Sequence, residues 1–406
     1  DGQFIGLTVG EDIAFALENQ CVAQPEMKQT VERVARLVDV ENLLDQEPHA
    51  LSGGQKQRVS LAGVMVDDVK VLLFDEPLAN LDPAAGKQTI ELIDQIQKKT
   101  GATVIIIEHR LEDVLWRSVD RIVLMGEGRI LADTTPEALL AGDQLTENGI
   151  REPLYITALK YAGVSLEAEK KPAHVNTLLL TEQDKAAVRD WYRQTVVRPQ
   201  PPAAAPLLEV KDLCFGYSEG VTNLRDVSFT LSEGEMVSIV SRNGAGKSTL
   251  AKLICGFETP RSGSIRLNGR DLAGDTIKER AAHIGYVMQN PNQMISQSLI
   301  FDEVALGLRT AKLPEDEVER RVNEALTVCG LYPFRKWPVS ALSFGQKKRV
   351  TIASVLVMQP RVLILDEPTA GQDFRHYTEI MEFLRSLNQK GYTVIMVTHD
   401  MHLMLE

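Results

Sequence analysis

Residues 237–249, with the sequence Val-Ser-Ile-Val-Ser-Arg-Asn-Gly-Ala-Gly-Lys-Ser-Thr, restrict the possible folds more than any other stretch. The apolar run from Val237 to Val240 predicts a buried β-strand. A glycine-containing turn follows, and we expect a helix to begin near Gly246. A strand, such a turn and a helix together form a phosphate cradle, because the N–H groups of the turn and the positive end of the helix dipole point at one place.

The side chains of this loop suit nucleotide phosphates. Lys247 is expected to contact the β- and γ-phosphates of ATP, and the Ser248 hydroxyl to bind Mg²⁺. In the usual pattern, G-x-x-x-x-G-K-[ST], the first glycine is replaced here by Ser241. We expect a modest loss of ATP affinity from Ser241, because a Cβ crowds a tight turn; the Ser241→Gly variant would bind ATP more tightly. The predicted ATP-binding residues are Ser241, Arg242, Asn243, Gly244, Ala245, Gly246, Lys247, Ser248 and Thr249.

Composition excludes several classes of protein. With 406 residues, the chain has room for two or three domains. No apolar run approaches the roughly 18–20 residues of a membrane-spanning helix. The net charge of −12 argues against nucleic acid as the main partner. The four cysteines are scattered without C-x-x-C spacing, which predicts reduced thiols in a cytosolic protein and neither a disulfide framework nor a cysteine metal site.

Three motifs occur twice along the chain, at a separation of 290 or 291 residues, which predicts two copies of one folding unit. The counterpart of Lys247 would precede residue 1. We therefore expect a fragment of a longer two-unit chain, with the first unit present only from its middle onward. The repeated pairs are Ser52 with Ser343, Asp75 with Asp366, and His109 with His399.

A proline- and alanine-rich stretch at residues 198–206 is the clearest domain boundary. Periodicity is already weak from about residue 143. We expect the end part of the first unit at 1–142, a linker region at 143–206, and the second unit at 207–406 without its C-terminal end.

An Asp-Glu pair follows an apolar strand in each copy. In the second copy, Asp366 is expected to bind Mg²⁺ through water, and Glu367 to be the general base for the attacking water. Asp75 and Glu76 occupy the same places in the first copy. An acidic pair can merely end a strand, but a second pair at the same offset favours the catalytic interpretation.

Three further residues are candidates for catalysis or ATP binding, and each also has an ordinary structural explanation. His399 is expected to hydrogen-bond the γ-phosphate; a lone histidine is more often structural, but the match with His109 favours a catalytic role for both. Gln289 follows a predicted strand at 284–288, although loop glutamines are usually just solvated. Tyr217 could stack on adenine or be a half-buried strand tyrosine.

The order of phosphate loop, L-S-x-G-Q segment, apolar strand with Asp-Glu, and histidine resembles that of the ABC-type ATPases. The most specific features are Leu51-Ser-Gly-Gly-Gln55 and the strand at 71–76. The resemblance implies the α/β P-loop NTPase fold in two tandem nucleotide-binding domains, the first truncated. It also implies that Gln289 contacts Mg²⁺ and the attacking water. It further implies that ATP binds between the loop of one unit and the L-S-x-G-Q segment of the other.

This pairing assigns roles to both L-S-x-G-Q segments. The 241–249 loop is expected to be closed by the first segment, and a second site, with Asp75, Glu76 and His109, by the other. Phe344 replaces a glycine in the second segment, and we expect it to hinder the approach to a γ-phosphate and to weaken or slow that site. The two segments contain Ser52, Gly53, Gly54 and Gln55, and Ser343, Phe344, Gly345 and Gln346.

Residues 290–294 (Asn-Pro-Asn-Gln-Met) and 302–306 (Asp-Glu-Val-Ala-Leu) resemble the energy-coupling-factor importers, which include cobalt- and vitamin-uptake ATPases. In that group this segment receives coupling helices of a membrane partner. The resemblance implies a peripheral ATPase on the cytoplasmic face of the membrane. Its partners would be a transmembrane coupling protein and a substrate-binding membrane subunit, and its cargo a vitamin, a vitamin precursor or a metal ion.

Two alternatives stay open. A soluble ABC ATPase acting on ribosomes or DNA would be expected to have a basic arm, zinc-type cysteines or a long charged linker, and the acidic balance speaks against it. A regulatory unit that binds ATP without turnover would not need Glu76 and Glu367, and both are retained.

Overall fold

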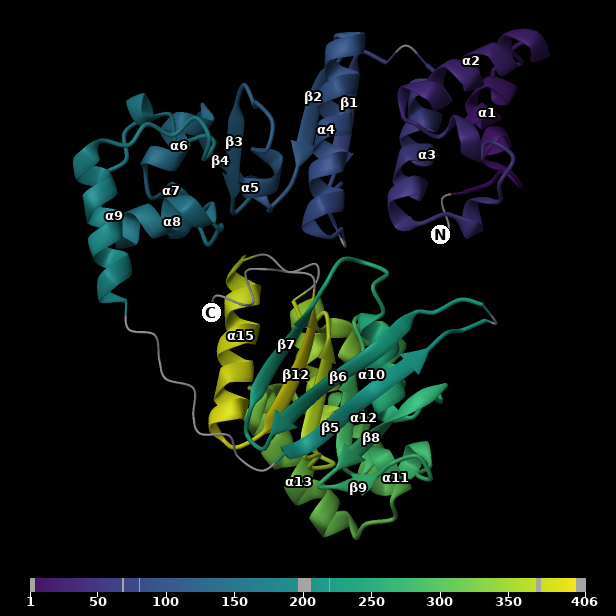
Figure 1. Ribbon diagram of the computed structural model, residues 1–406, viewed down its shortest axis with the longest axis vertical. Helices are drawn as coiled ribbons and strands as arrows, with labels where there is room; N and C mark the ends of the chain where they lie inside the picture. Colours follow the sequence, from purple (N-terminus) through teal and green to yellow (C-terminus); the bar gives the residue numbers. More distant parts are fainter. Residues whose placement is uncertain are drawn as a thin grey trace. The chain divides into compact units, whose positions relative to one another are not determined.

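The computed structural model describes two compact units, Asp1–Val196 and Val197–Glu406 (Figure 1). The residues described are 4–67, 69–79, 81–195, 206–218, 220–369 and 374–398.

The second unit is built on a parallel sheet, as the apolar runs predict. Its strands are ordered β10-β11-β12-β7, and each pairs in parallel with its neighbour. Alternate residues of β11 face two different cores: Leu363 and Leu365 lie in one, and Val362 and Ile364 in the other. The bounds are β7 (Met236–Val240), β10 (Ile284–Val287), β11 (Val362–Asp366) and β12 (Thr393–Thr398).

Strand β7 is half-buried along its whole length, whereas the sequence predicted a buried strand. The reason is its place in the sheet: β7 is the end strand and pairs only with β12. Strands from both sides of β7 in the sequence form a separate antiparallel sheet, ordered β6-β5-β8-β9. Those strands are β5 (Pro206–Phe215), β6 (Leu224–Ser232), β8 (Ser262–Leu267) and β9 (Arg270–Asp271).

Helices complete the second unit. Helix α10 packs against β10, β11 and β12, while α12, α13 and α14 pack on one another. Buried Arg280 holds the end of α10, because its Nη1 donates to the carbonyls of Leu253 and Ile254 at 2.9 and 3.2 Å. The helices are α10 (Lys247–Cys255), α11 (Ile277–Ala281), α12 (Ile300–Thr310), α13 (Glu315–Val328), α14 (Phe344–Leu356) and α15 (Phe374–Gln389), with short 3₁₀ turns η4 (Pro291–Gln293), η5 (Tyr332–Phe334) and η6 (Val339–Ala341).

The first unit repeats part of this architecture, which agrees with the predicted duplication. Strands β1 (Val71–Asp75) and β2 (Thr103–Ile107) pair in parallel with the register of β11 and β12. Helices α1, α2 and α3 share a core as α12, α13 and α14 do. The helices are α1 (Val9–Asn19), α2 (Gln24–Leu37), α3 (Gly53–Met65) and α4 (Pro83–Thr100), with 3₁₀ turns η1 (Glu41–Leu43) and η2 (Pro48–Ala50).

The repeat extends to individual hydrogen bonds. Asp12 accepts the backbone N–H groups of Ile5 and Gly6, at 2.8 and 3.1 Å. Glu303, 291 positions later, accepts those of Ser296 and Gln297, at 2.8 and 2.7 Å. An acidic side chain in the first turn of α1 and of α12 therefore fixes the segment that precedes each helix.

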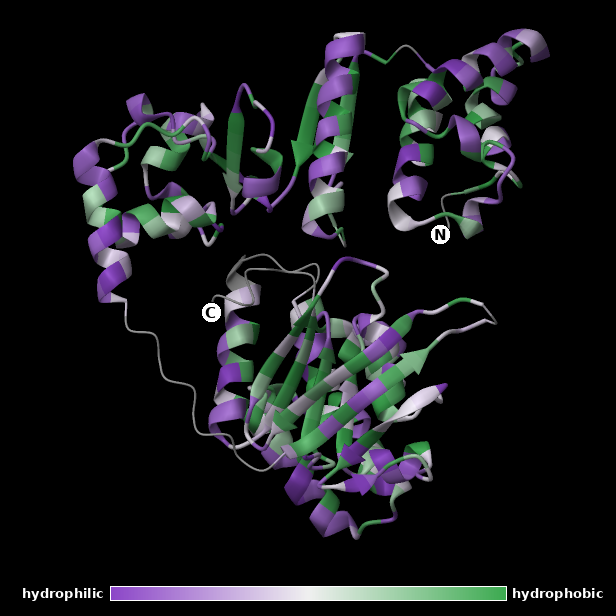
Figure 2. Cartoon of the chain, viewed as in Figure 1, coloured by the Kyte–Doolittle hydropathy of each residue, from purple (hydrophilic) through white to green (hydrophobic). Residues whose placement is uncertain are grey.

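One face of the β1–β2 pair is exposed, although the apolar sequences of both strands are typical of buried strands. Val71, Leu73, Ile105 and Ile107 are 57, 64, 49 and 51% exposed. The equivalent residues of β11 and β12 are fully buried in the core that contains α10 and the antiparallel strands. Figure 2 shows the hydrophobic character of β1 and β2. No described segment of the first unit supplies such a cover.

Residues 143–195 fold as part of the first unit, although the sequence predicted a linker from residue 143. Their short helices share a core with the β3–β4 hairpin that includes Leu124, Leu140 and Ile156. Within the predicted linker region 143–206, the residues outside the described part are 196–205, which contain most of the proline-rich stretch. The elements are α5 (Leu111–Val114), β3 (Ile122–Gly126), β4 (Arg129–Thr134), α6 (Pro136–Ala141), α7 (Gln144–Glu147), α8 (Leu154–Tyr161), η3 (Ala168–Lys170) and α9 (Glu182–Gln194).

Candidate functional site

The predicted site residues of the second unit meet at one edge of its parallel sheet. The 241–249 loop follows β7, Gln289 lies just after β10, and Asp366 ends β11. Because these strands are parallel, their carboxyl ends lie at the same edge, which is where α/β sheets bind ligands. His399, which follows β12, lies outside the described residues.

The 241–249 loop has the shape of a phosphate cradle. Gly244 and Gly246 have left-handed backbones, with φ of 79° and 99°. A Cβ on Gly246 would lie 2.6 Å from Cδ2 of Leu224, so this position requires glycine. The ammonium of Lys247 donates to the carbonyls of Ser241 and Arg242, at 2.9 and 3.2 Å. Lys247 therefore lies folded over the loop where phosphate oxygens would bind.

The backbone at Ser241 and the surroundings of Tyr217 bear on the roles expected for these two residues. Ser241 is not among the residues with positive φ, so its backbone does not need the freedom of glycine. The left-handed backbone that would make Ser241 unfavourable is thus absent. Tyr217 is 54% exposed, and its hydroxyl lies 3.3 Å from Oγ1 of Thr249 at the start of α10. Tyr217 therefore lies beside the loop with much of its side chain accessible.

Asp366 and Glu367 are buried at the end of β11, with exposures of 6% and 7%. Tyr286 on β10 donates its hydroxyl to Oδ2 of Asp366 at 2.8 Å. Burial, with the negative charge of Asp366 as a second cause, raises the pKa of Tyr286 above its usual value, so this hydroxyl stays a donor at neutral pH. Thr398 donates its hydroxyl to Oε2 of Glu367 at 3.1 Å.

Both candidate general bases have a strained backbone. Glu367 has φ 45° and Glu76 has φ 47°, in the left-handed region that non-glycine residues avoid. Each donates its backbone N–H across to the neighbouring strand: Glu367 to Val397 at 2.8 Å, and Glu76 to Ile107 at 2.9 Å. Such strain costs on the order of 1–3 kcal/mol and is concentrated at functional sites. The same strained residue in both units favours a catalytic role for both glutamates.

The first unit brings Glu76 and His109 together. Oε1 of Glu76 lies 3.8 Å from Nδ1 of His109. Glu108 occupies the place of Thr398, and its side chain is 3% exposed; its carboxylate accepts the N–H groups of Leu78, His109 and Arg110, at 2.9, 3.0 and 3.2 Å. The two sites thus differ: Thr398 donates its hydroxyl to Glu367, whereas Nδ1 of His109 lies 3.8 Å from both Glu76 and Glu108.

The two L-S-x-G-Q segments each begin a helix. Ser52 caps α3 and Ser343 caps α14, each in a reciprocal capping box with the glutamine three residues later. A Cβ on Gly53 would meet nothing within 4 Å. Phe344, at the equivalent place, is 42% exposed. Its own unit therefore accommodates Phe344, and any hindrance would act on a ligand or partner in front of the helix.

Sequence reasoning missed Lys348, which is 1% exposed beneath the site. Its ammonium donates to the carbonyls of Met288, Gln289 and Asp366, at 2.9, 2.8 and 3.5 Å. Burial lowers the pKa of Lys348 to about 8, and the carboxylates of Asp366 and Glu367 oppose that shift. The sequence signal that could have revealed Lys348 is the difference between the two copies. Two residues after the L-S-x-G-Q segment, the second unit has this lysine where the first unit has Gln57.

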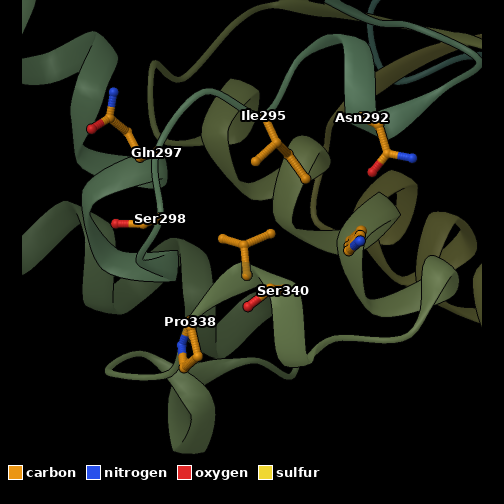
Figure 3. Close-up of a pocket in the computed structure, with 8 residues that line it drawn as sticks. Asn292, Ile295, Gln297, Ser298, Pro338 and Ser340 are labelled. Carbon is orange, nitrogen blue, oxygen red and sulfur yellow. The ribbon is translucent and has the colours of Figure 1, made fainter.

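A pocket of about 280 Å³ lies next to the segment that follows Gln289 (Figure 3). It is formed between that segment, the turn η6 and the start of α14. The segment includes the 290–294 motif that resembles energy-coupling-factor importers. The lining residues are Asn292, Ile295, Gln297, Ser298, Pro338, Val339, Ser340 and Lys347.

Known proteins are similar to this chain along its whole length. A family model described as ABC transporter matches residues 2–79 and 224–370, which is more than half of the chain. A relative from Clostridium perfringens, described as an ABC transporter ATP-binding protein, is 60% identical over 406 residues, covering 100% of this chain and 71% of the relative. The chain belongs to the ABC transporter ATP-binding proteins. It is an ABC transporter ATPase with two ABC regions, and ATP is its nucleotide.

Other relatives of this ABC ATPase agree. An ABC transporter ATP-binding protein of Enterococcus faecalis is 59% identical over 410 residues, covering 100% of this chain and 71% of that relative. A second family model, described as ATP-binding cassette cobalt transporter, matches residues 142–215. A solved structure of cbiO1 from Clostridium perfringens, described as part of the ABC transporter complex cbiONQ, has 40% identity and a TM-score of 0.46. It covers 48% of this chain and 79% of that one.

None of the helices in the described part of this ABC ATPase is long and apolar enough to cross a membrane. Among the same residues, no group of three or more His, Cys, Asp and Glu side chains is placed to hold a metal ion.

Proposed function

We propose that this ABC ATPase is the energy-coupling subunit of an importer of the energy-coupling-factor type. Its cargo would be a vitamin, a vitamin precursor or a metal ion. The observation that carries the proposal is the match of residues 142–215 to the cobalt-transporter model. Within this range, residues 143–195 fold with the β3–β4 hairpin as part of the first unit. The motif at 290–294 beside the pocket supports the same assignment.

The residues at the sheet edge suit ATP bound with Mg²⁺. The hydroxyl of Ser248, the carboxylate of Asp366 and the side-chain amide of Gln289 offer the oxygen ligands that Mg²⁺ prefers. Mg²⁺ usually keeps several waters and binds phosphate oxygens, which fits a site with few protein carboxylates. Asp75 would serve in the same way in the first unit. When bound, the ion neutralises charge on the β- and γ-phosphates.

The chain's own groups account for the hydrolytic step. Lys247 would exchange its two carbonyl partners for phosphate oxygens when ATP enters the loop. Glu367 would accept the proton of the attacking water at one carboxylate oxygen. Thr398 donates to Oε2 of Glu367 and so limits its rotation. We assign His399 to the γ-phosphate on the same reasoning, with Glu76 and His109 as the matching pair of the first unit.

Head-to-tail pairing of the units is part of the proposal. Residues 52–55 would close the ATP site of the 241–249 loop, and residues 343–346 the site that contains Glu76. A helix N-terminus with a glycine-rich start is a suitable phosphate cradle without a lysine of its own. The capping boxes of Ser52 and Ser343 keep both helix starts in the required form.

The proposed partners are a transmembrane coupling protein and a substrate-binding membrane subunit. The pocket beside residues 292–298 would receive a helical segment of the coupling protein. This docking would put the ATPase at the cytoplasmic face of the membrane. We expect no nucleic acid partner, since the net charge is −12.

Purification of the full-length tagged protein from gently solubilised membranes tests this function. We expect small polytopic membrane proteins to co-purify, and the Ile295→Asp variant to lose them while it still binds ATP. Ile295 lines the pocket, whereas the ATP loop is a separate segment. Recovery with ribosomes or DNA in place of membrane proteins would refute the importer and favour a soluble ABC ATPase.

A further inference from the structure

Lys348 lies under the ATP site of the second unit but is not part of the mechanism above. It is on α14, five residues after the serine that caps this helix. Its ammonium contacts the chain at two other motifs, the Gln289 segment and the end of β11. Three segments that are far apart in sequence thus meet at one nitrogen atom.

The geometry of this contact is specific. The ladder between β10 and β11 ends at the pair Val287 and Leu365. The ammonium of Lys348 donates to the carbonyls of Met288, Gln289 and Asp366, which come directly after this last pair. The ammonium therefore continues the connection between the two strands beyond the point where their own hydrogen bonds stop.

The burial of the Lys348 ammonium is favourable only while its carbonyl partners stay in place. A lysine with 1% exposure has lost its water, and a buried charge without partners is strongly unfavourable. An ammonium has three N–H donors, and three carbonyls surround this one. A displacement of the Gln289 segment from β11 would leave donors of a buried cation unsatisfied. Lys348 thus resists such a displacement.

The first unit shows what the same place contains without a lysine. Gln57 lies 291 positions before Lys348, and its Nε2 donates to the carbonyl of Pro77 at 3.0 Å. Its Oε1 has no hydrogen-bond partner among the described residues. The glutamine is neutral and makes one such bond, so the cationic cluster of Lys348 is a property of the second unit's site.

We propose that Lys348 is a positioning residue for ATP hydrolysis at the second unit's site, holding the Gln289 segment at a fixed distance from the end of β11. The side chains of Gln289 and Asp366 are thereby kept in register for one Mg²⁺ ion and one attacking water. Lys348 touches neither ATP nor the ion. The role of Lys348 rests on the proposed roles of Gln289 and Asp366. The experiment distinguishes a failure of the Lys348 proposal from a failure of those two roles.

The test uses the full-length protein with Lys348→Met, which keeps the side-chain length but removes the donors. Lys348→Gln, the residue of the first unit, is the conservative variant. Lys336→Met, at an exposed lysine of the same unit, is the matched control. Three quantities are measured: hydrogen exchange of residues 288–294, binding of a fluorescent ATP analogue in EDTA, and ATPase rate against Mg²⁺ concentration.

For Lys348→Met we expect faster exchange at 288–294, unchanged ATP binding in EDTA, and a kcat lowered about tenfold or more, the usual cost of losing support for metal ligands. Half-maximal activity should need more Mg²⁺, and Lys348→Gln should lie between the variant and the parent. The control should match the parent.

Unchanged exchange at 288–294 in a folded Lys348→Met protein would overturn the proposal. Equal losses of ATP binding, thermal stability and rate would also overturn it, since they indicate a purely structural lysine. If Lys348→Met does not fold, Lys348→Gln decides by the same criteria, and failure of both variants to fold assigns Lys348 to stability alone. Faster exchange with an unchanged Mg²⁺ requirement would retain the connection between the segments but refute the roles of Gln289 and Asp366.

Discussion

Replacing Glu367 by glutamine tests the central chemical assignment. The exchange keeps the size of the side chain and its position at φ 45°, and Thr398 can still donate to the amide oxygen. The fold around β11 should therefore survive. The amide cannot take a proton from water, so only the general-base contribution is removed.

The magnitude follows from that single loss. General-base catalysis contributes about 10²- to 10⁴-fold, or roughly 3–5 kcal/mol of transition-state stabilisation. Because Glu367 is 7% exposed, we expect little solvent access to replace it. The kcat of the Glu367→Gln protein should fall by at least about 100-fold, while ATP affinity stays within about threefold of the parent, since the 241–249 loop is untouched.

The assay is single-turnover hydrolysis of ATP by the purified full-length protein, with equilibrium binding of ATP measured on the same samples. Glu76→Gln is the matched variant in the first unit, where the strained glutamate is the same but the neighbour is Glu108. Full single-turnover activity in Glu367→Gln would refute the role of Glu367 as the base, however well the variant binds ATP.

Further substitutions test the loop, the second cradle and the exposed sheet. Gly246→Ala should weaken ATP binding at least about tenfold, because its Cβ would meet Leu224 at a φ of 99°; titration with a fluorescent ATP analogue that finds parent-like affinity contradicts this. Phe344→Gly should raise the turnover of the assembled transporter, and an unchanged steady-state rate would show that the phenyl ring does not hinder the site. In denaturant unfolding, Ile364→Ala should cost about 2–5 kcal/mol but Leu73→Ala, 64% exposed, less than about 1 kcal/mol; equal costs would show that the β1–β2 face is covered.

Much of the site could be predicted because its motifs lie at the ends of strands. Asp366 and Glu367 follow an apolar run, and the pairing of parallel strands then fixes which side of the sheet they occupy. The duplication could be predicted from spacing alone, and the equal register of β1–β2 and β11–β12 agrees with it.

The remaining contacts of the site could not be predicted, since they join residues far apart in sequence. The bond from Tyr286 to Asp366 spans 80 residues, and that from Lys348 to Gln289 spans 59. No periodicity or local motif records such a pair. The linker prediction for 143–206 failed to anticipate folded structure for a different reason: α7 and α8 have only 4 and 8 residues, too few for a clear helical period.

The exposed face of β1 and β2 shows a second limit of prediction from periodicity. Four apolar residues in alternation correctly indicate strands that can be buried, and the equivalent residues of the second unit are fully buried. Burial itself depends on a cover, which α10 and the antiparallel sheet supply in the second unit. The strand pattern therefore predicts that these strands can be buried, but it does not predict whether another element covers them.

The two units share a backbone frame but surround their proposed catalytic glutamates with different groups. Thr398 donates its hydroxyl to Glu367, and the ammonium of Lys348 lies 3.5 Å from the carbonyl of the preceding residue, Asp366. In the first unit, Glu108 takes the place of Thr398 and Gln57 that of Lys348. A hydroxyl donor and a buried cation are thus replaced by a carboxylate, which only accepts hydrogen bonds when ionised, and a neutral amide. The duplicated frame fixes the position of each glutamate, and the neighbours that are not duplicated differ in hydrogen bonding and charge. We therefore expect the two ATP sites to differ in rate even with identical nucleotide.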